Sequence, residues 1–260
     1  MKNYKQTALK LAKAAGKIMR DNFVPNIDNE WKGDNTPVTK VDYAINKLVL
    51  ETIGGKYPTH SVLAEEESDM KSDAEYVWVC DPLDGTLPFS FGVPIFTFSI
   101  ALVKDGEPIL GVVYDPITDR MYSAEKGKGA FLNDQKIEVN KQSSLKHAVF
   151  NVDGDGDVLP NYNFIKIFDN LRKQNSKVFK FYSIINSGML VAAGGFSGAI
   201  FLKDTAHDSA TIKIMVEEAG GKVTDLDGND QRYDEKCNGL VATNGLVHEQ
   251  VLDMIGKSKT

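Results

Sequence analysis

Several features that mark other classes of protein are missing from this chain of 260 residues. It has only two cysteines, Cys80 and Cys237, and neither belongs to a C-x-x-C pair or a Cys/His zinc pattern. We therefore expect both to be reduced core thiols. No stretch approaches the roughly 18 consecutive apolar residues of a membrane helix, and the sequence after Met1 is amphipathic and lacks a signal-peptide core. These absences predict a cytoplasmic protein that does not enter a membrane.

Basic charge is also scarce. The chain has 30 Lys and Arg against 36 Asp and Glu, a net charge of −6, which argues against a general nucleic-acid-binding protein because such proteins carry a basic excess. The composition, 42% hydrophobic and 25% charged, is typical of a globular protein. An acidic protein that handles phosphate needs cations to offset its own field, which makes a bound metal the first expectation.

The first half of the chain predicts two helices followed by a largely antiparallel sheet. Apolar residues at helical spacing indicate a helix over about 4–23 and another from Thr39 to about Ile53, with 25–37 as a loop between them. Alternating and apolar runs predict strands at 61–64, 76–80, 96–103, 109–114, 121–123 and 130–132.

In the second half of the chain, the predicted helices and short strands alternate. The helical patterns cover about 161–174, 184–193, 209–219 and 246–255. The strands lie near 148–151, 199–202, 222–225 and 239–243. Such alternation indicates an α/β layer. We therefore predict an N-terminal α+β subdomain, 1–145, that carries the metal motif, and a C-terminal α/β subdomain, 146–260, that supplies the last metal ligand and the substrate pocket.

The most informative segment is Asp81-Pro-Leu-Asp84-Gly85-Thr86, which follows a buried strand. Strand ends commonly hold ligands, and Pro82 turns the chain so that both carboxylates can converge. Free backbone N–H groups at Gly85 and Thr86 suit an anion. Two carboxylates beside such amides fit a hard cation bridged to a phosphate, although a simple turn would use the same residue types.

Three other acids have structural as well as functional interpretations. Glu65 begins a Glu triplet after an apolar strand, where a solvated turn is the common explanation. Asp42 completes a capping box with Thr39. Asp208 begins a helical pattern and so fits an N-cap. None of these acids identifies a site by itself.

Taken together, the motifs resemble the inositol monophosphatase family. The segment from Asp81 to Thr86 is similar to that family's D-P-[IL]-D-G-T signature, and the other motifs occur in the family's order over nearly the whole chain. These motifs are Asp34-Asn-Thr-Pro-Val-Thr-Lys-Val-Asp42, Tyr57-Pro-Thr-His-Ser-Val-Leu-Ala-Glu65-Glu66, Gly111-Val-Val-Tyr-Asp-Pro116, Lys126-Gly-Lys-Gly-Ala130, His207-Asp208 and Glu218-Ala-Gly-Gly221.

The resemblance implies a magnesium site of two or three ions. Glu65, Asp81 and the Leu83 carbonyl would hold one Mg²⁺, and Asp81, Asp84 and Asp208 a second. Glu65 would also help to place a third, weaker ion through water. Paired metals can stabilise both the attacking and the leaving oxygen of a phosphoryl transfer.

The resemblance also implies the catalytic and phosphate-binding residues. Thr86, paired with Asp42, would orient and deprotonate the attacking water, with Glu65 beside it as a further catalytic residue. Asp84 and the backbone amides of Gly85 and Thr86 would bind the phosphate. The implied fold is a layered αβαβα sandwich, as in inositol monophosphatase and fructose-1,6-bisphosphatase, and many members are homodimers.

The substrate side departs from the family pattern. Pro88 stands where G-T-x-N-F has Asn, His207 where inositol-specific members have Trp, and Phe201 where they have an acid. Phe179 falls on the basic position of the R-x-x-G-[ST] segment, which ends here at Ser183. Ser183, Phe201 and His207 are therefore the expected substrate contacts, but the directional bonds that recognise a polyol are lost.

These departures leave the substrate open between several small phosphorylated metabolites. Inositol monophosphate or a sugar phosphate is the first expectation, and histidinol phosphate, fructose 1,6-bisphosphate and 3′-phosphoadenosine 5′-phosphate are alternatives that relatives of this fold hydrolyse. Lys180, Lys203 and His207 are candidate contacts for such a substrate. A metal-binding regulatory protein is the non-enzymatic alternative.

Two other patterns carry no site. Asp153-Gly-Asp155-Gly-Asp157 is similar to the start of a calcium loop, but Val158 and Phe164 replace the required Gly and Glu. Gly127-Lys-Gly129 lacks the spacing of a phosphate-binding P-loop. No Ser/His/Asp or Cys/His nucleophile pattern occurs.

Overall fold

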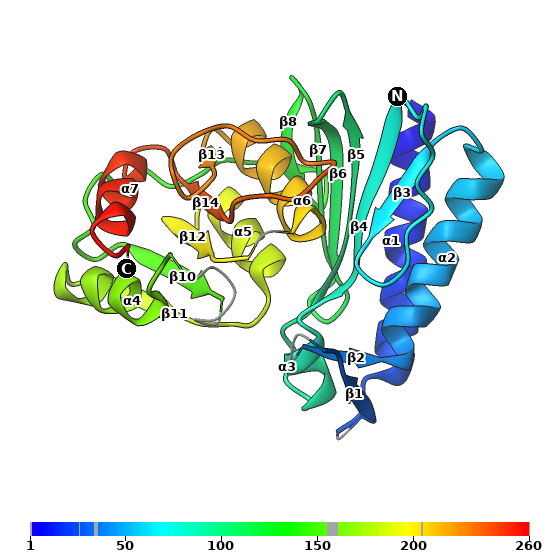
Figure 1. Ribbon diagram of the computed structural model, residues 1–260, viewed down its shortest axis with the longest axis horizontal. Coiled ribbons are helices and arrows are strands. Elements are labelled where there is room, and N and C mark those ends of the chain that lie inside the picture. Colours follow the sequence, from blue (N-terminus) through cyan, green and yellow to red (C-terminus); the bar gives the residue numbers. More distant parts are fainter. Residues whose placement is uncertain (1, 26, 34–35, 155–160, 204, 260) are drawn as a thin grey trace.

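A computed structural model describes residues 2–25, 27–33, 36–154, 161–203 and 205–259. Helices and sheets alternate in five layers across the molecule (Figure 1). Two outer helices cover one face of a large sheet, two helices separate that sheet from a smaller one, and two more helices cover the far face of the smaller sheet. This confirms the layered αβαβα fold.

The large sheet has seven strands in the order β3-β4-β5-β6-β7-β8-β9. All neighbouring strands are antiparallel except the parallel pair β3 and β4. The strands are β3 (Ser61–Ala64), β4 (Tyr76–Asp84), β5 (Thr97–Lys104), β6 (Glu107–Asp115), β7 (Arg120–Glu125), β8 (Gly129–Leu132) and β9 (Gln135–Ile137). The largely antiparallel sheet was predicted, but β9 was not, because its three residues are mostly polar.

The small sheet has five strands in the order β11-β10-β12-β14-β13. The strands are β10 (Val149–Asp153), β11 (Lys177–Phe179), β12 (Gly198–Phe201), β13 (Lys222–Thr224) and β14 (Leu240–Thr243). β10 pairs parallel to both β11 and β12, whereas β14 pairs antiparallel to β12 and β13. The sequence predicted four of these strands and missed the edge strand β11, which is short and half-exposed.

The helices cover the sheets with their apolar sides. They are α1 (Lys2–Asn22), α2 (Lys40–Lys56), α3 (Thr86–Ser90), α4 (Phe164–Lys173), α5 (Ile184–Ala192), α6 (Ala206–Glu218) and α7 (His248–Gly256). α2 continues past the expected stop at Gly54-Gly55, and the N–H of Tyr57 bonds to the carbonyl of Ile53 beyond it. None of the helices in the described ranges combines the length and apolar character needed to cross a bilayer.

The stretch predicted as a loop over 25–37 contains a small hairpin, so that prediction was wrong in part. β1 (Asn29–Trp31) pairs antiparallel with β2 (Pro37–Thr39). Each strand has three residues, too few for a periodic pattern, and the Pro37 amide cannot donate to a ladder. The hairpin stands at one end of the large sheet (Figure 1). Asp34 and Asn35 of the quoted motif lie outside the described residues.

The two sheets share a core. The switch from one sheet to the other falls between Ile137 and Val149. A single cluster of buried side chains joins β4 and β5 of the large sheet to α5, α6 and β12. α6 therefore links both sheets, and the division into two subdomains near residue 145 stays a prediction.

Candidate metal-dependent active site

The end of β4 carries two carboxylates on the same side because the strand is irregular there. In a regular strand, side chains three residues apart point to opposite faces. Here Asp81 pairs with Ser99 and Asp84 with Thr97, so β4 contains one residue more than its partner between these two pairs. Such a bulge re-aims a side chain. The N–H of Leu83 donates to Asp81 Oδ1 at 2.9 Å and fixes the turn.

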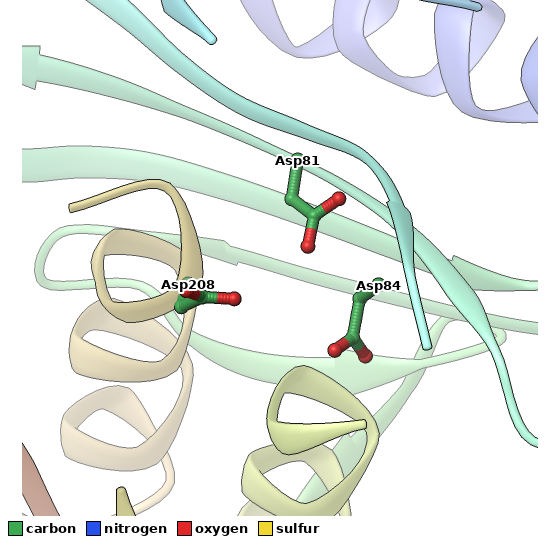
Figure 2. Close-up of side chains that lie close together, drawn as sticks. All are labelled: Asp81, Asp84 and Asp208. Atoms are coloured by element: carbon green, nitrogen blue, oxygen red, sulfur yellow. The ribbon is translucent and has the colours of Figure 1, made fainter. Parts of the chain in front are cut away.

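A third carboxylate approaches from the other half of the chain. Asp208 lies in the first turn of α6, and Asp81, Asp84 and Asp208 each offer an oxygen within 4.8 Å of the others. Figure 2 shows the three side chains pointing into one space between the sheet and the helix ends. The structural prediction for Asp208 was wrong: Thr205 is the N-cap, and its hydroxyl contacts Asp208 Oδ2.

The electrostatics of this cluster favour a cation. Burial, followed by the charge of Glu65 and of the other two aspartates, raises the pKa of Asp81 well above its usual range. Burial, with a contribution from Asp208, raises the pKa of Asp84 to about 7, against the stabilising donors Ser183, Asn186 and Thr97. Buried like charges at this separation are costly. An all-oxygen set of ligands suits a hard divalent ion such as Mg²⁺.

Glu65 lies at the same pocket, at the end of β3. Its Oε1 accepts a bond from Lys32 Nζ at 3.0 Å, and Lys32 also binds Glu66 at 2.5 Å. Burial would raise the pKa of Glu65, but the charges of His207 and Lys32 outweigh it, and the pKa is lowered. An ionised Glu65 close to the cluster adds negative charge for a metal, and the Glu triplet is more than a solvated turn.

Asp42 caps α2 with one carboxylate oxygen and contacts Thr86 with the other. Its Oδ2 accepts bonds from the backbone N–H of Thr39 at 2.8 Å and from the Thr39 hydroxyl at 2.6 Å, which completes the capping box of α2. Its Oδ1 is 3.0 Å from Thr86 Oγ1. Burial raises the pKa of Asp42 to about 6, although the Thr39 bonds oppose the shift. The cap therefore fixes the carboxylate that faces Thr86.

The chain between Asp84 and α3 requires glycine. Gly85 has a φ of +86°, and an added Cβ would lie 2.5 Å from the carbonyl oxygen of Ile95. Only glycine adopts this conformation without strain and tolerates this contact. The turn brings Thr86 Oγ1 within 2.9 Å of the Leu83 carbonyl oxygen, so both groups lie beside the carboxylate cluster.

A cavity of about 350 Å³ opens over these residues. Its wall includes Ser183 and Phe201, two of the three expected substrate contacts. The Ser183 hydroxyl donates to Asp84 Oδ2 at 2.6 Å and so positions a carboxylate. His207 does not belong to this wall as described: its Nε2 lies 3.5 Å from Asp208 Oδ2.

The wall also includes residues that the sequence did not single out. Trp31, Asp153 and Tyr182 line it, beside Lys203, which the sequence did offer as a candidate contact. Trp31 and Tyr182 are not part of any apolar periodic pattern in the sequence. Asp153 belonged to the calcium-loop pattern that the sequence analysis rejected. The other members of that pattern, Asp155, Asp157 and Val158, lie outside the described residues. One signal existed for Tyr182, because it precedes Ser183 in the segment that departs from the family pattern.

One family-like motif is structural. The carboxylate of Glu218 accepts bonds from the backbone N–H groups of Gly127 and Gly129, at 2.6 and 2.7 Å. These contacts fasten the β7–β8 turn to the end of α6. Lys126-Gly-Lys-Gly129 and Glu218 therefore hold α6 against the large sheet, and the first turn of α6 carries Asp208.

Comparison with known proteins agrees with this geometry. The model of the inositol monophosphatase family matches residues 1–259. The chain belongs to the inositol monophosphatase family. Members of this family are metal-dependent phosphoric monoester hydrolases, and the chain is a phosphoric monoester hydrolase.

Relatives within the family are named after different substrates. The inositol-1-monophosphatase of Rhizobium meliloti is 35% identical over 221 residues, which cover 82% of each chain. The histidinol-phosphatase of Mycobacterium tuberculosis is 34% identical over 254 residues, 94% of this chain and 95% of the relative. The solved structure of the Thermotoga maritima IMPase has a TM-score of 0.89 at 28% identity and covers 99% of this chain and 98% of its own.

Proposed function

We propose that this protein hydrolyses a small phosphate monoester with a water molecule that Thr86 and Asp42 activate beside a Mg²⁺ site. The observation that carries the proposal is the convergence of Asp81, Asp84 and Asp208, with ligand oxygens within 4.8 Å, at a cavity that also contains Thr86. A non-catalytic metal protein would not need the Thr86–Asp42 pair.

The ligands proposed for the metals are the residues implied by the family resemblance. Asp81, Asp84 and Asp208 would hold one Mg²⁺, and Glu65, Asp81 and the Leu83 carbonyl a second. A third, weaker ion is proposed at Glu65, where Lys32 Nζ lies 3.0 Å from Oε1. Bound Mg²⁺ would supply the positive charge that offsets the phosphate and makes a water molecule easier to deprotonate.

The chain's own residues would move the proton. The Thr86 hydroxyl lies 3.0 Å from Asp42 Oδ1 and 2.9 Å from the Leu83 carbonyl. Its single proton can serve one of these acceptors at a time, which leaves an oxygen lone pair for a hydrogen bond from water. Asp42, with a pKa raised by burial to about 6, is suited to accept a proton near neutral pH. The amides of Gly85 and Thr86, with Asp84, are proposed to bind the phosphate.

The proposed substrate is a small phosphorylated metabolite that is not recognised through the hydroxyl contacts that inositol makes in other members of the family. Phe201, only 6% exposed, occupies the position of the inositol-binding acid and offers no hydrogen bond. Ser183 and Phe201 would contact the substrate or its phosphate from the cavity wall, and His207 would act on it through Asp208.

The decisive experiment is phosphate release from a simple monoester with Mg²⁺, with EDTA and in Asp81→Asn. We expect release with Mg²⁺ alone, and a loss of roughly a hundredfold or more in the other two conditions. Asp225→Asn is the matched control, since Asp225 is a buried acid that accepts bonds from the N–H groups of Asp227 and Asn229, away from the cavity. Undiminished release in EDTA or in Asp81→Asn would contradict the mechanism.

We further propose that the protein is a cytoplasmic homodimer. Cys80 and Cys237 are both buried thiols, which is compatible with a reducing compartment. The segment after α3 exposes Phe91 and Val93, and these side chains could pack against a second copy. Sedimentation equilibrium of the wild type and of Phe91→Ser checks the dimer: a monomeric wild type would refute it.

A further inference from the structure

Three aromatic side chains line the cavity together with the carboxylates. Trp31 comes from β1, Tyr182 from the segment between β11 and α5, and Phe201 from β12. Trp31 and Tyr182 expose 58% and 46% of their surface. Aromatic rings in a cavity wall present flat faces and edges that favour other planar groups.

Tyr182 occupies a backbone position that suits glycine. Its φ is +56°, a region that bulky side chains rarely adopt because Cβ crowds the backbone. The family's R-x-x-G-[ST] segment has glycine at this position, directly before Ser183. Glycine would remove the strain. A strained backbone that carries an exposed ring into a binding cavity indicates that the ring has a function there.

Buried and charged groups hold Tyr182 in this conformation. Its backbone N–H donates to Asp153 Oδ1 at 3.1 Å, and Asp153 Oδ2 accepts a bond from Asn151 Nδ2 at 2.7 Å. Asp153 is only 4% exposed and pairs across the sheet with Phe201. Lys180 Nζ lies 4.3 Å from the centre of the Tyr182 ring, a distance that favours cation–π attraction. These contacts hold the backbone at Tyr182 and place a cation beside its ring.

The two charged residues that the family pattern supplies for a polyol are replaced here, although Asp153 and Lys203 also line the cavity. Hydroxyl-rich leaving groups need directional donors and acceptors, but phenylalanine occupies both positions where the family has a charged partner, Phe201 and Phe179. We propose that Tyr182 is a specificity-determining residue that selects phosphate monoesters whose alcohol carries a planar aromatic ring, with Trp31 as a second contact. The proposal rests on the proposed function, because it assigns the leaving-group end of the same site.

Binding of matched phosphonates tests the proposal without turnover. 2-Phenylethylphosphonate and 2-cyclohexylethylphosphonate have the same length and charge, and only the first has a planar ring. Calorimetric titration in Mg²⁺ is expected to show about fivefold to tenfold tighter binding of the aromatic compound. Equal affinity of the wild type for the two phosphonates overturns the proposal.

Variants assign the preference to the ring. Tyr182→Phe keeps the ring and should keep the preference, whereas Tyr182→Gly relaxes the backbone and should reduce it to about twofold or less. Phe179→Leu is the control, because Phe179 is an exposed aromatic residue on β11 outside the described cavity wall, and it should keep the preference. A preference that survives Tyr182→Gly unchanged also overturns the proposal.

Turnover separates this proposal from the function on which it rests. Phosphate release is measured from benzyl phosphate and cyclohexylmethyl phosphate, whose leaving groups are both primary alcohols. A protein that binds the aromatic phosphonate preferentially but hydrolyses neither ester would refute the proposed hydrolysis and support the assignment of the ring site. Hydrolysis of both esters at equal kcat/KM, with equal phosphonate affinities, would support the proposed hydrolysis and refute the assignment of the ring site.

Discussion

Replacing Asp84 with asparagine should stabilise the metal-free protein and at the same time remove its activity. The oxygens of Asp81, Asp84 and Asp208 lie within 4.8 Å of one another. At this distance and an effective dielectric constant of about 20, each pair of charges repels by about 3–4 kcal/mol. Asp84→Asn removes two of the three pairs.

Several terms reduce the net gain. The cluster already takes up protons, because burial and mutual repulsion raise the pKa values of its aspartates. Asp84 Oδ2 also accepts bonds from the Ser183 and Thr97 hydroxyls and the Asn186 N–H, and an amide oxygen accepts such bonds more weakly. We expect a net gain of about 1–3 kcal/mol, which corresponds to a rise in Tm of about 2–8 °C.

The assay is thermal unfolding at pH 8, with EDTA and with Mg²⁺, alongside phosphate release. Mg²⁺ at a hundred times its Kd should stabilise the wild type by about 2.7 kcal/mol, and Asp84→Asn should lose this response together with its activity. Asp115→Asn is the control: this buried acid accepts bonds from the N–H groups of Ile117 and Thr118, so its neutralisation should lower Tm. An Asp84→Asn variant that in EDTA melts as far below the wild type as Asp115→Asn would refute the repulsion argument.

Three further changes test other parts of the structure. Thr86→Ala should reduce kcat by about a hundredfold or more with little change in the Mg²⁺ titration, and Thr86→Ser should keep most of the wild-type kcat. Equal rates for the two variants would contradict a role of the Thr86 hydroxyl in proton transfer. Burial, followed by the charge of Lys222, lowers the pKa of His248 to about 4 from 6.5. As the pH falls, the unfolded chain therefore binds the proton before the folded chain does. Neutral His248 contributes about 3 kcal/mol to the free energy of unfolding above pH 6.5, and this contribution is lost as the pH falls towards 4. Urea unfolding at pH 7 and pH 4.5 should show a smaller loss of stability for His248→Gln than for the wild type. Glu218→Gln should lower the free energy of unfolding by about 1 kcal/mol, because a neutral group accepts bonds from the two glycine amides more weakly, while kcat/KM of the folded variant stays at the wild-type value.

Most of the secondary structure was predictable because its signals are local. The apolar runs at 96–103 and 109–114 predicted two strands, and these form the hairpin of β5 and β6. Thr39 and Asp42 predicted the start of α2, and the capping box is present. The three-residue strands β1, β9 and β11 were not predicted, because a hydrophobic period is visible only over more residues.

The candidate site was only partly predictable. Spacing indicated that Asp81 and Asp84 belong together, but their convergence depends on a register shift against β5. Asp208 joined them only through the family resemblance, since it lies 124 positions after Asp84 and nothing local links the two. The aromatic wall was missed, because exposed aromatic residues such as Trp31 and Tyr182 show no pattern before the fold brings them to one cavity.

The sequence by itself determined the order of helices and strands, the turn at Gly85 and the set of acids available for a metal. These follow from propensities and steric limits that act within a few residues. The tertiary structure decided which acids share a space, that one carboxylate of Asp42 could both cap α2 and face Thr86, and that a strained tyrosine borders the same cavity. The physical reason is that burial and charge–charge contact depend on the packing of both sheets against α5 and α6, which no short segment specifies alone.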